Sequence, residues 1–386
     1  MSPILLAAMT AAAAFPANAA APAVNPASVR TLLYRVTVLE DPKNRHFVEA
    51  RAINNRGEVV GVSVTQPAPG RAPEWHGFIY HGGKYNALPP LLGNRYSEAV
   101  AINDGGVVAG TSSPTASGGR AVIWRNGTAH TLPAPSKTSR ALAISNKGIV
   151  VGSYGVPGSS QAAWWNVSNS AKPVPMGKPL AGYTRATAVS DAGDVVTLAG
   201  AHSYIVNGDK SLRVGTLGGS DTMAVAINSQ GDVVGFSNTQ TDLTHAFLWR
   251  RGVIRDVSVM RAIDGTAGVL SVDSINNQGV MVGTVRSGMD TRAMVCMNNH
   301  PSNLNHLIPH TGLVLDVARA INDHGQIVGQ GHIGQRFVSF LLTPLSAKSV
   351  RLAPASALMI TPATYQPAGP LPGSKRATTK KVEPGA

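Results

Sequence analysis

The chain has 386 residues, of which 43% are hydrophobic and only 14% are charged, and it contains 41 glycines and 26 prolines. This mixture is too apolar for an intrinsically disordered chain and suits many short strands joined by tight turns. The single cysteine excludes an intramolecular disulfide, and the net charge of +13 comes without the basic runs that nucleic-acid readers carry.

The first residues have the pattern of an export signal. An apolar run from Ile4 to Phe15 is followed by Ala17-Asn18-Ala19, a typical cleavage pattern, although no lysine or arginine precedes the run. We interpret residues 1–22 as a signal peptide and 23–33 as a linker, so we expect a secreted or periplasmic protein. A plain alanine-rich arm is the alternative.

One phrase recurs seven times between residues 52 and 329, and its first copy reads AINNRGEVVG. Each copy has a glycine at the sixth position. These glycines are spaced from 38 residues (Gly193 to Gly231) to 49 residues (Gly57 to Gly106) apart. A period in the forties with strand-like contents is typical of a propeller blade. The seven are Gly57, Gly106, Gly148, Gly193, Gly231, Gly279 and Gly325.

Within the phrase, Asn-x-x-Gly between two apolar runs predicts a β-hairpin. Asn54 can accept a backbone hydrogen bond where the turn begins, and Gly57 is expected at positive φ, where a Cβ would be strained. The recurring acids and amides raise the alternative of a calcium site, but most copies hold one acid or none, and calcium needs several converging carboxylates. We therefore interpret these residues as turn-forming: Asn54, Asn55, Asn103, Asp104, Asp191, Asn276, Asn277, Asn322 and Asp323.

Each unit contains two further strands. One precedes the phrase, as at 34–39 for the first unit and 211–217 for the fifth, and the other ends in an aromatic-rich segment such as His245-Ala246-Phe247-Leu248-Trp249. Trp75 and Trp164 depart from this pattern and are candidates for an exposed contact with a ligand. The repeated aromatic residues are expected to be buried between blades: Tyr80, Trp124, Trp165, Trp249 and Phe340.

A polar residue opens each aromatic strand, and these seven residues are the candidate binding residues. In a propeller they would occupy equivalent positions and form a ring that attracts carboxylates or phosphates. The alternative is that each one hydrogen-bonds to a nearby turn, such as the asparagine of its own blade, and fixes the strand register. The residues are His76, Arg120, Gln161, His202, His245, Arg292 and Arg336.

Four strands of about five residues account for a period in the forties. A lone four-stranded sheet cannot bury two apolar faces, whereas seven sheets arranged radially cover one another. We predict an all-β fold, a seven-bladed β-propeller of four-stranded antiparallel blades at 34–344, with an open β-solenoid as the alternative. The mode of ring closure stays open. Residues 345–386, rich in Pro, Ala and Thr with scattered Lys, are predicted to be a disordered tail.

The repeats resemble those of the HAF-repeat family of exported bacterial proteins, named after the tripeptide seen here as His245-Ala246-Phe247. The resemblance covers about 34–344 and includes Thr216-Leu217-Gly218-Gly219. It is looser in units four and six, where Thr197 replaces the last glycine of the phrase and Cys296 replaces the aromatic residue. The resemblance implies export and repeat architecture, and no general activity or catalytic residue set comes with it.

No linear catalytic motif stands out: there is no G-x-S-x-G elbow, no H-E-x-x-H and no phosphate loop. We therefore predict a non-catalytic binding or scaffold module for a polysaccharide, cell-surface or protein partner, without cofactor or metal. An anionic partner would suit the basic charge, and neither specific nucleic-acid binding nor a transmembrane segment in the mature chain is expected. Two alternatives remain, a secreted hydrolase or lyase with its site at the channel mouth, since propeller active sites draw single residues from several blades, and a purely structural envelope component.

Overall fold

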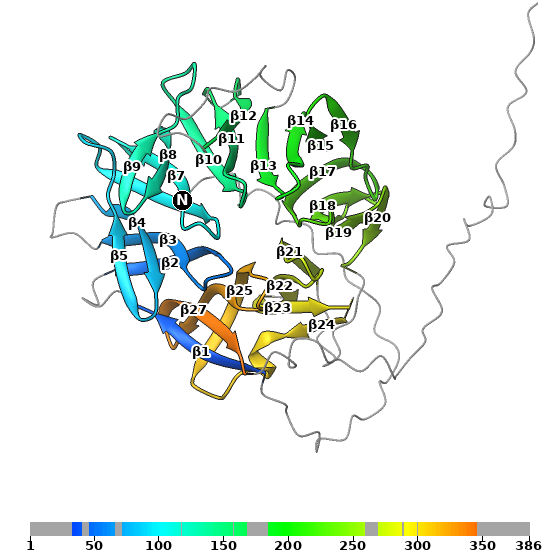
Figure 1. Cartoon of the computed structure of the whole chain (residues 1–386). Helices are drawn as coiled ribbons and strands as arrows, with labels where there is room; N and C mark the ends of the chain where they lie inside the picture. The colour runs from blue at the N-terminus through cyan, green and yellow to red at the C-terminus, as the bar shows by residue number, and fades with distance from the viewer. Residues whose placement is uncertain are drawn as a thin grey trace, which may run out of the picture. The chain divides into compact units, whose positions relative to one another are not determined.

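The computed structural model describes residues 33–40, 46–65, 72–116, 118–156, 158–167, 184–258, 269–287, 289–298 and 300–345. These residues form seven antiparallel sheets arranged in a ring around an axis (Figure 1). The predicted all-β fold, a seven-bladed β-propeller, is confirmed. The segments interpreted as signal peptide, linker and tail lie outside the described residues, apart from Leu33 and Leu345.

The first, innermost strands of the seven blades are β2 (His46–Ile53), β6 (Tyr96–Ile102), β10 (Ser139–Ile144), β13 (Arg185–Val189), β17 (Gly218–Ile227), β21 (Val269–Ile275) and β25 (Leu313–Ile321). The second strands are β3 (Val59–Thr65), β7 (Val108–Ser113), β11 (Ile149–Tyr154), β14 (Val195–Ala199), β18 (Val233–Thr239), β22 (Met281–Ser287) and β26 (Ile327–Ile333).

The third strands are β4 (Glu74–His81), β8 (Arg120–Arg125), β12 (Gln161–Asn166), β15 (His202–Asn207), β19 (Thr244–Arg250), β23 (Asp290–Met297) and β27 (Arg336–Pro344). The outer strands are β5 (Lys84–Leu88), β9 (Thr128–Thr131), β16 (Lys210–Arg213), β20 (Val253–Asp256), β24 (His300–Asn303) and β1 (Tyr34–Leu39), and a short 3₁₀ helix at Leu304–His306 follows β24. The third blade has three strands within the described residues, and residues 168–183, which follow them, lie outside.

The first strand of the chain closes the ring. β1 pairs antiparallel with β27, from Tyr34 opposite Pro344 to Leu39 opposite Ser339, and so completes blade 7. The sequence pattern assigned this strand to the first unit, and that assignment is wrong. The segment at 211–217 is corrected in the same way, because β16 is the outer strand of blade 4. Each repeated phrase therefore opens a blade, and the strand before it ends the previous one.

Every innermost strand carries a β-bulge two residues before its turn, as between Ala50 and Ala52 in β2. The bulge pushes the backbone of the first strand toward the second. A Cβ at Gly235 would overlap the carbonyl oxygen of Met223, and the last glycine of the phrase meets the same obstacle in five other blades. This explains the last glycine of the phrase. Blade 4 departs from it with Thr197, which is fully buried.

Apolar side chains fill the spaces between blades. Trp124 and Trp165 are 1% exposed, and their indole N–H groups donate to the carbonyl oxygens of Pro89 and Pro133 in the preceding connections, at 2.7 and 2.6 Å. Trp249 is also buried and Tyr80 is half-buried. The aromatic residues that end the third strands thus pack between blades, as their spacing predicts.

The register of blade 7 differs from the one inferred from sequence. In blade 5, Trp249 pairs with Val233, which stands two residues before the second-strand glycine Gly235. In blade 7 the residue two before the second-strand glycine is Ile327, and it pairs with Leu342. Phe340 instead pairs with Gly329 and is buried there. The sequence pattern therefore placed blade 7 two residues out of register.

Replacing either of the two glycines of one repeat by alanine should lower the stability of the protein, but for different reasons. Gly231→Ala adds a Cβ in open space at φ +80°, and we expect a cost of about 1 kcal/mol from backbone strain alone. Gly235→Ala pushes a Cβ into the β17 backbone, and we expect about 3 kcal/mol. Chemical denaturation of both variants measures the difference, and equal losses would contradict the steric role of the bulge.

Candidate functional site

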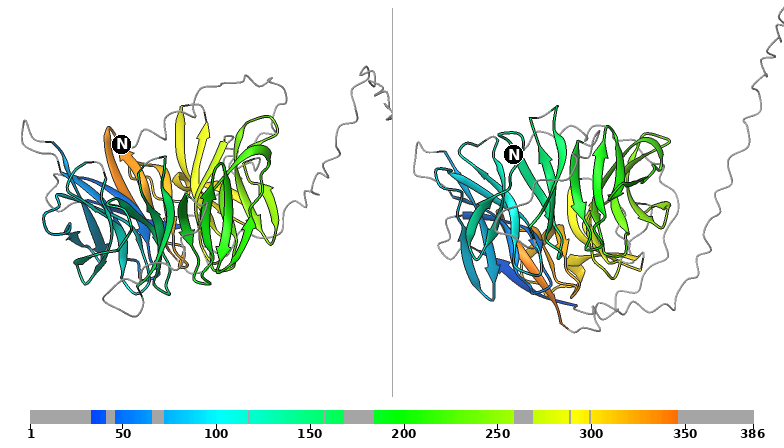
Figure 2. Two further views of the ribbon diagram at one scale, coloured as in Figure 1. Left: turned by 90° about the horizontal axis from the view of Figure 1, so that it is seen from above. Right: turned by 45° about the horizontal axis from the view of Figure 1, so that its top comes forward.

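Alternating strand direction gives the ring two faces (Figure 2). The hairpins between first and second strands lie at one edge of each sheet. The first and third strands begin at the opposite edge, because each strand is antiparallel to the next. We call the edge with the repeated hairpins the turn face and the other edge the loop face.

On the turn face the seven hairpins converge on one cavity of about 210 Å³ at the axis, which we call the cup. Its floor is a tier of β-branched residues, one from the end of each innermost strand. The two turn residues that follow form polar walls. The floor residues are Ile53, Ile102, Ile144, Val189, Ile227, Ile275 and Ile321.

The hairpins have the predicted conformation. In the first one the Asn54 side-chain oxygen accepts from the backbone N–H groups of Arg56 and Glu58, at 3.1 and 2.9 Å, and Gly57 has φ +75°. All seven turns close through the same pair of backbone hydrogen bonds. The interpretation of these asparagines as turn-forming residues therefore agrees with the geometry.

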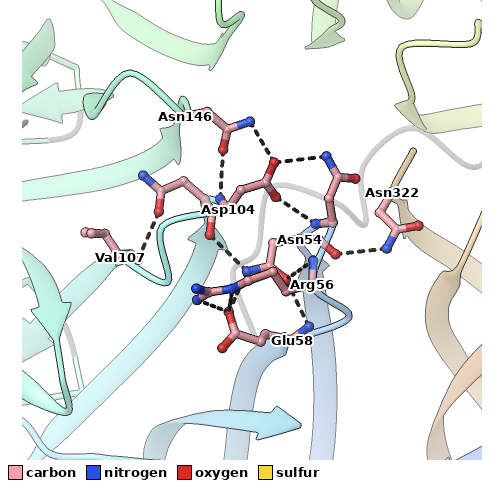
Figure 3. A network of polar contacts seen from close by, with 9 residues as sticks. Asn54, Arg56, Glu58, Asp104, Val107, Asn146 and Asn322 are labelled. Carbon is pink, nitrogen blue, oxygen red and sulfur yellow. Dashed lines mark hydrogen bonds and ion pairs between the residues drawn. The ribbon is translucent and has the colours of Figure 1, made fainter. Parts of the chain in front are cut away.

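The same asparagines also join neighbouring blades. The Asn54 amide donates to the backbone oxygen of Asn103 at 2.9 Å, and Asn322 donates to that of Asn54 at 2.8 Å, which links blade 7 to blade 1 (Figure 3). Equivalent bonds join blades 2 to 3, 5 to 6 and 6 to 7. Blades 3 and 4 have Ser145 and Ser190 at this position, whose side chains are too short to reach across.

The second turn position makes another ring, in which amides and carboxylates alternate. The Asn55 amide donates to Asp104 and Asp323 on either side at 3.0 and 3.1 Å, and the Asn146 amide donates to Asp104 and Asp191 at 3.0 and 2.9 Å. All of these side chains except that of Ser229 also accept the backbone N–H of the preceding blade, as Asp104 does from Asn55 at 2.7 Å. Such bonds cross six of the seven blade junctions within the described residues.

Seven is odd, so strict alternation of donor and acceptor side chains cannot close the ring. Ser229 stands at the irregular place, between Asp191 of blade 4 and Asn277 of blade 6. Its hydroxyl is 3.5 Å from the Asp191 carboxylate, and within the described residues no backbone bond joins the two. Ser229 therefore keeps two carboxylates from becoming neighbours and leaves this junction the weakest of the ring.

The cup offers little free chemistry. Its volume of about 210 Å³ lies below the roughly 300–1,000 Å³ of typical ligand pockets, so it has no room for a polymer. Among the described residues that line it are three carboxylates and no lysine or arginine, and these carboxylates already accept hydrogen bonds within the ring. Among the described residues no group of three or more His, Cys, Asp or Glu side chains is placed to hold a metal ion. The cup is primarily a joint between blades.

The seven candidate binding residues all lie on the loop face, where the third strands begin. In blade 1, Gly61 of the second strand pairs with Phe78 of the third strand, and His76 stands two residues before Phe78. Six of the seven candidates occupy this position in their own blades. Arg336 stands four residues before the equivalent Phe340. The seven thus share a face and lie at the opposite edge from the cup, so the alternative of bonding to the turn asparagine of the same blade is not what the structure contains.

Four of the seven pair with a carboxylate on the same face. His245 Nδ1 lies 2.6 Å from Asp256, and Arg336 lies 2.8 Å from Glu40. The other two pairs are His76 with Glu74 at 3.7 Å and Arg292 with Asp290 at 3.5 Å. A hydrogen bond from Arg95, which lies 2.8 Å away, is the main cause that lowers the pKa of the Glu74 carboxyl. All four pairs belong to blades 1, 5, 6 and 7.

The remaining three belong to blades 2, 3 and 4. Gln161 accepts a hydrogen bond from the Tyr154 hydroxyl at 2.7 Å, and His202 contacts another base, Arg213, at 3.0 Å. Arg120 is exposed and has no acidic partner within the described residues. The ring of equivalent residues is therefore divided into a neutralised part and a part that is not.

Three further bases lie at the same edge of blades 2 to 4, and sequence reasoning missed them. Lys137 precedes β10, and Arg140 and Arg185 lie at the starts of β10 and β13. The described aspartates of these blades, Asp104, Asp191, Asp194 and Asp209, all lie in turns on the turn face. We call the bases of this edge the basic sector: Arg120, Lys137, Arg140, Arg185, His202 and Arg213. Arg140 and Arg185 stand three residues before a repeated phrase and Lys137 stands six residues before one, which is why the repeat did not reveal them.

The two candidate aromatic residues are less accessible than predicted. Trp75 is half-buried and stacks on Tyr96 with ring centroids 4.2 Å apart, and Trp164 is also half-buried. Exposed aromatic side chains occur instead at the seam between blades 7 and 1. There Phe47 and Phe337 form an edge-to-face pair with centroids 6.5 Å apart.

No protein-family model matches the chain, and no curated protein matches its sequence. Among solved structures, the chain is similar to the β-propeller domain of the Trilobed protease from Pyrococcus furiosus. The TM-score is 0.56 at 8% sequence identity, covering 80% of this chain and 98% of that domain. That domain has an open velcro topology, whereas here β1 closes the ring.

The chain is also similar to the acylaminoacyl peptidase from Pyrococcus horikoshii, with a TM-score of 0.50 at 9% identity over 78% of this chain. It spans 52% of that peptidase, about half of its length. At such identities the likeness shows the β-propeller fold alone. No helix in the described part of the chain is long and apolar enough to cross a membrane.

Two substitutions at Ser229, whose new side chains are nearly isosteric with each other, test the hydrogen-bonded ring of second turn residues. Ser229→Asn supplies an amide beside Asp191 and should raise the unfolding free energy by about 1 kcal/mol. Ser229→Asp places a second carboxylate there and should be less stable than Ser229→Asn at pH 7. This difference in unfolding free energy between the two variants should disappear below about pH 4, where carboxylates are protonated. Thermal unfolding at both pH values measures this, and a gap independent of pH would refute the alternation.

Proposed function

We propose that the protein is an exported member of the HAF-repeat family and a non-catalytic binding module that takes an acidic polysaccharide on its loop face. The observation that carries this is the basic sector: six bases across three neighbouring blades, none with an acidic partner among the described residues. Unpaired like charges on one surface favour an anionic partner. The sector runs over several blades, which suits a polymer with repeated charges.

An anionic membrane surface is the competing partner, and the distribution of apolar side chains argues against it. Membrane-surface binding combines basic residues with apolar side chains that enter the lipid. The described loop-face residues with exposed phenylalanine or methionine side chains are Phe47, Met289 and Phe337, in blades 1, 6 and 7. Beside the basic sector only single aliphatic side chains are exposed among the described residues, namely Leu92, Val156 and Leu212. A hydrated polyanion fits this sector better.

The second candidate is a hydrolase, and two histidine–carboxylate pairs favour it. His245 Nδ1 is 2.6 Å from Asp256, and His332 Nδ1 is 2.7 Å from Asp316 on the innermost strand of blade 7. A carboxylate orients such an imidazole for proton transfer. One of the similar structures is the β-propeller domain of a protease, and another is a peptidase of which this chain spans about half, which raises peptide bonds as a substrate. If this alternative is right, His332→Ala should abolish peptide hydrolysis by the folded chain, whereas no turnover in the unmodified chain would exclude it.

Charge reversal in the basic sector tests the binding proposal. Arg120→Glu and Lys137→Glu should each weaken binding of alginate about fivefold at low salt, because an exposed charge interaction is worth about 1 kcal/mol at most. Added salt should weaken the unmodified chain's binding in the same direction. Titration of a labelled alginate at two salt concentrations measures both effects, and neutral dextran should not bind.

Lys147→Glu is the matched control, because Lys147 is an exposed lysine in a turn on the opposite face. It makes the same change in net charge and should leave alginate binding unchanged. Equal losses in all three variants would mean that net charge alone governs binding. Vesicles with anionic lipid serve as the other arm, and binding to vesicles but not to alginate would overturn the proposal.

A further inference from the structure

Two arginines occupy equivalent positions on the innermost strands of neighbouring blades. Arg140 directly precedes the β-bulge of β10 between Ala141 and Ala143, and Arg185 directly precedes that of β13 between Ala186 and Ala188. The same position holds Glu49 in blade 1 and Glu98 in blade 2. Because innermost strands line the axis, these four residues belong to one tier around the channel, toward the loop face.

The acidic half of this tier is neutralised. Arg51, the bulged residue of β2, reaches Glu49 at 3.3 Å and Glu98 at 3.5 Å, so it bridges blades 1 and 2. One tier deeper, Arg319 of blade 7 lies 4.0 Å from Asp273 of blade 6, where burial raises the pKa of Asp273 and Arg319 opposes the rise. The charged groups on that half of the channel therefore have partners of opposite sign.

The basic half has no such partner among the described residues. Arg140 and Arg185 are both exposed, so a ligand can reach them from solvent. Protein surrounds enough of Arg185 that desolvation lowers its pKa, and the charge of Arg140 lowers it further. The two arginines stand at equivalent positions of neighbouring blades and their positive charges repel, so an anion between them would relieve both the repulsion and the lost hydration. Guanidinium groups bind carboxylate oxygens in pairs of parallel hydrogen bonds.

We propose that Arg140 and Arg185 form a subsite in the channel mouth for one carboxylate of the bound polysaccharide, supplied by a uronic acid unit. This inference rests on the proposed function, since it names the group that the acidic polymer inserts between blades 3 and 4. The rest of the basic sector contacts the chain of the polymer along the loop face. The subsite fixes the position of a single unit.

The test combines ligand binding with the stability of the ligand-free protein. Arg140→Gln and Arg185→Gln should each weaken binding of a uronic acid oligosaccharide at least tenfold. Both should also raise the melting temperature of the ligand-free chain, since each removes the repulsion between the two guanidinium groups. A residue with a merely structural role would lower that temperature. The probes are glucuronate, a neutral glucose oligomer, inorganic phosphate and sulfate.

Arg51→Gln is the matched control at a nearby position on the acidic half. It leaves Glu49 and Glu98 without their cation, so it should lower the melting temperature and leave the subsite arginines in place. We expect it to retain oligosaccharide binding. Loss of binding in Arg51→Gln equal to that in Arg140→Gln would show that the whole channel tier, rather than the arginine pair, is responsible, and would overturn the inference.

The outcomes separate this inference from the proposed function. If Arg140→Gln and Arg185→Gln bind the oligosaccharide as the unmodified chain does, while Arg120→Glu and Lys137→Glu do not, the subsite is wrong and the binding module stands. If alginate and the oligosaccharide do not bind at all, but phosphate or sulfate raises the melting temperature only when both arginines are present, the polysaccharide function fails and the anion site stands with another ligand. If phosphate or sulfate also raised the melting temperature of the Gln variants, the stabilisation would be a general effect of salt, and the proposed site would be refuted.

Discussion

Closure of the ring is the constraint on which the rest of this structure depends. Each blade has two apolar faces and is stable only between two neighbours, so the last blade must meet the first. Two devices make that junction. β1 completes blade 7 through backbone pairing with β27, and the turn asparagines continue across the seam, where Asn322 donates to the Asn54 backbone oxygen. The seam is therefore built like the other junctions, with a strand from the far end of the chain added to it.

The turn face shows how one short phrase serves two purposes. Asn54 organises its own hairpin through its side-chain oxygen and grips the next blade through its amide nitrogen. The next residue alternates between Asn and Asp, because an amide can donate to two carboxylates and a carboxylate can only accept. An odd number of blades forces one exception, and Ser229 fills it. The variation among the seven turns therefore reflects hydrogen-bonding constraints between neighbouring blades.

The parts of this architecture that are local in sequence were predictable, and the long-range parts were not. A glycine at positive φ and the capping asparagine act within five residues, so the hairpins, the strand content and the number of blades followed from the repeat. The partner of β1 lies three hundred residues away, and nothing in Tyr34–Leu39 states it. In blade 7 the sequence pattern took Phe340 as the aromatic residue that ends the third strand. Only the observed pairing of Gly329 with Phe340 shows that Leu342 occupies that position. Half of the basic sector, Lys137, Arg140 and Arg185, escaped because these residues lie outside the repeated segments.

Departures from symmetry are the best guide to function in a fold whose repeats explain its stability. Seven polar residues at equivalent positions first appear as one functional ring, but four of them have carboxylate partners on their own face and are satisfied there. In blades 2 to 4 the equivalent positions and their surroundings hold bases that have no such partner in the described part of the chain. Arg140 and Arg185 occupy the tier where blades 1 and 2 place Glu49 and Glu98 with a bridging arginine. Folding alone would favour the neutralised arrangement at both places, since unpaired like charges destabilise a compact state. Arginines without an acidic partner among the described residues on one side of the channel are therefore the reason for proposing a ligand that supplies the missing negative charge.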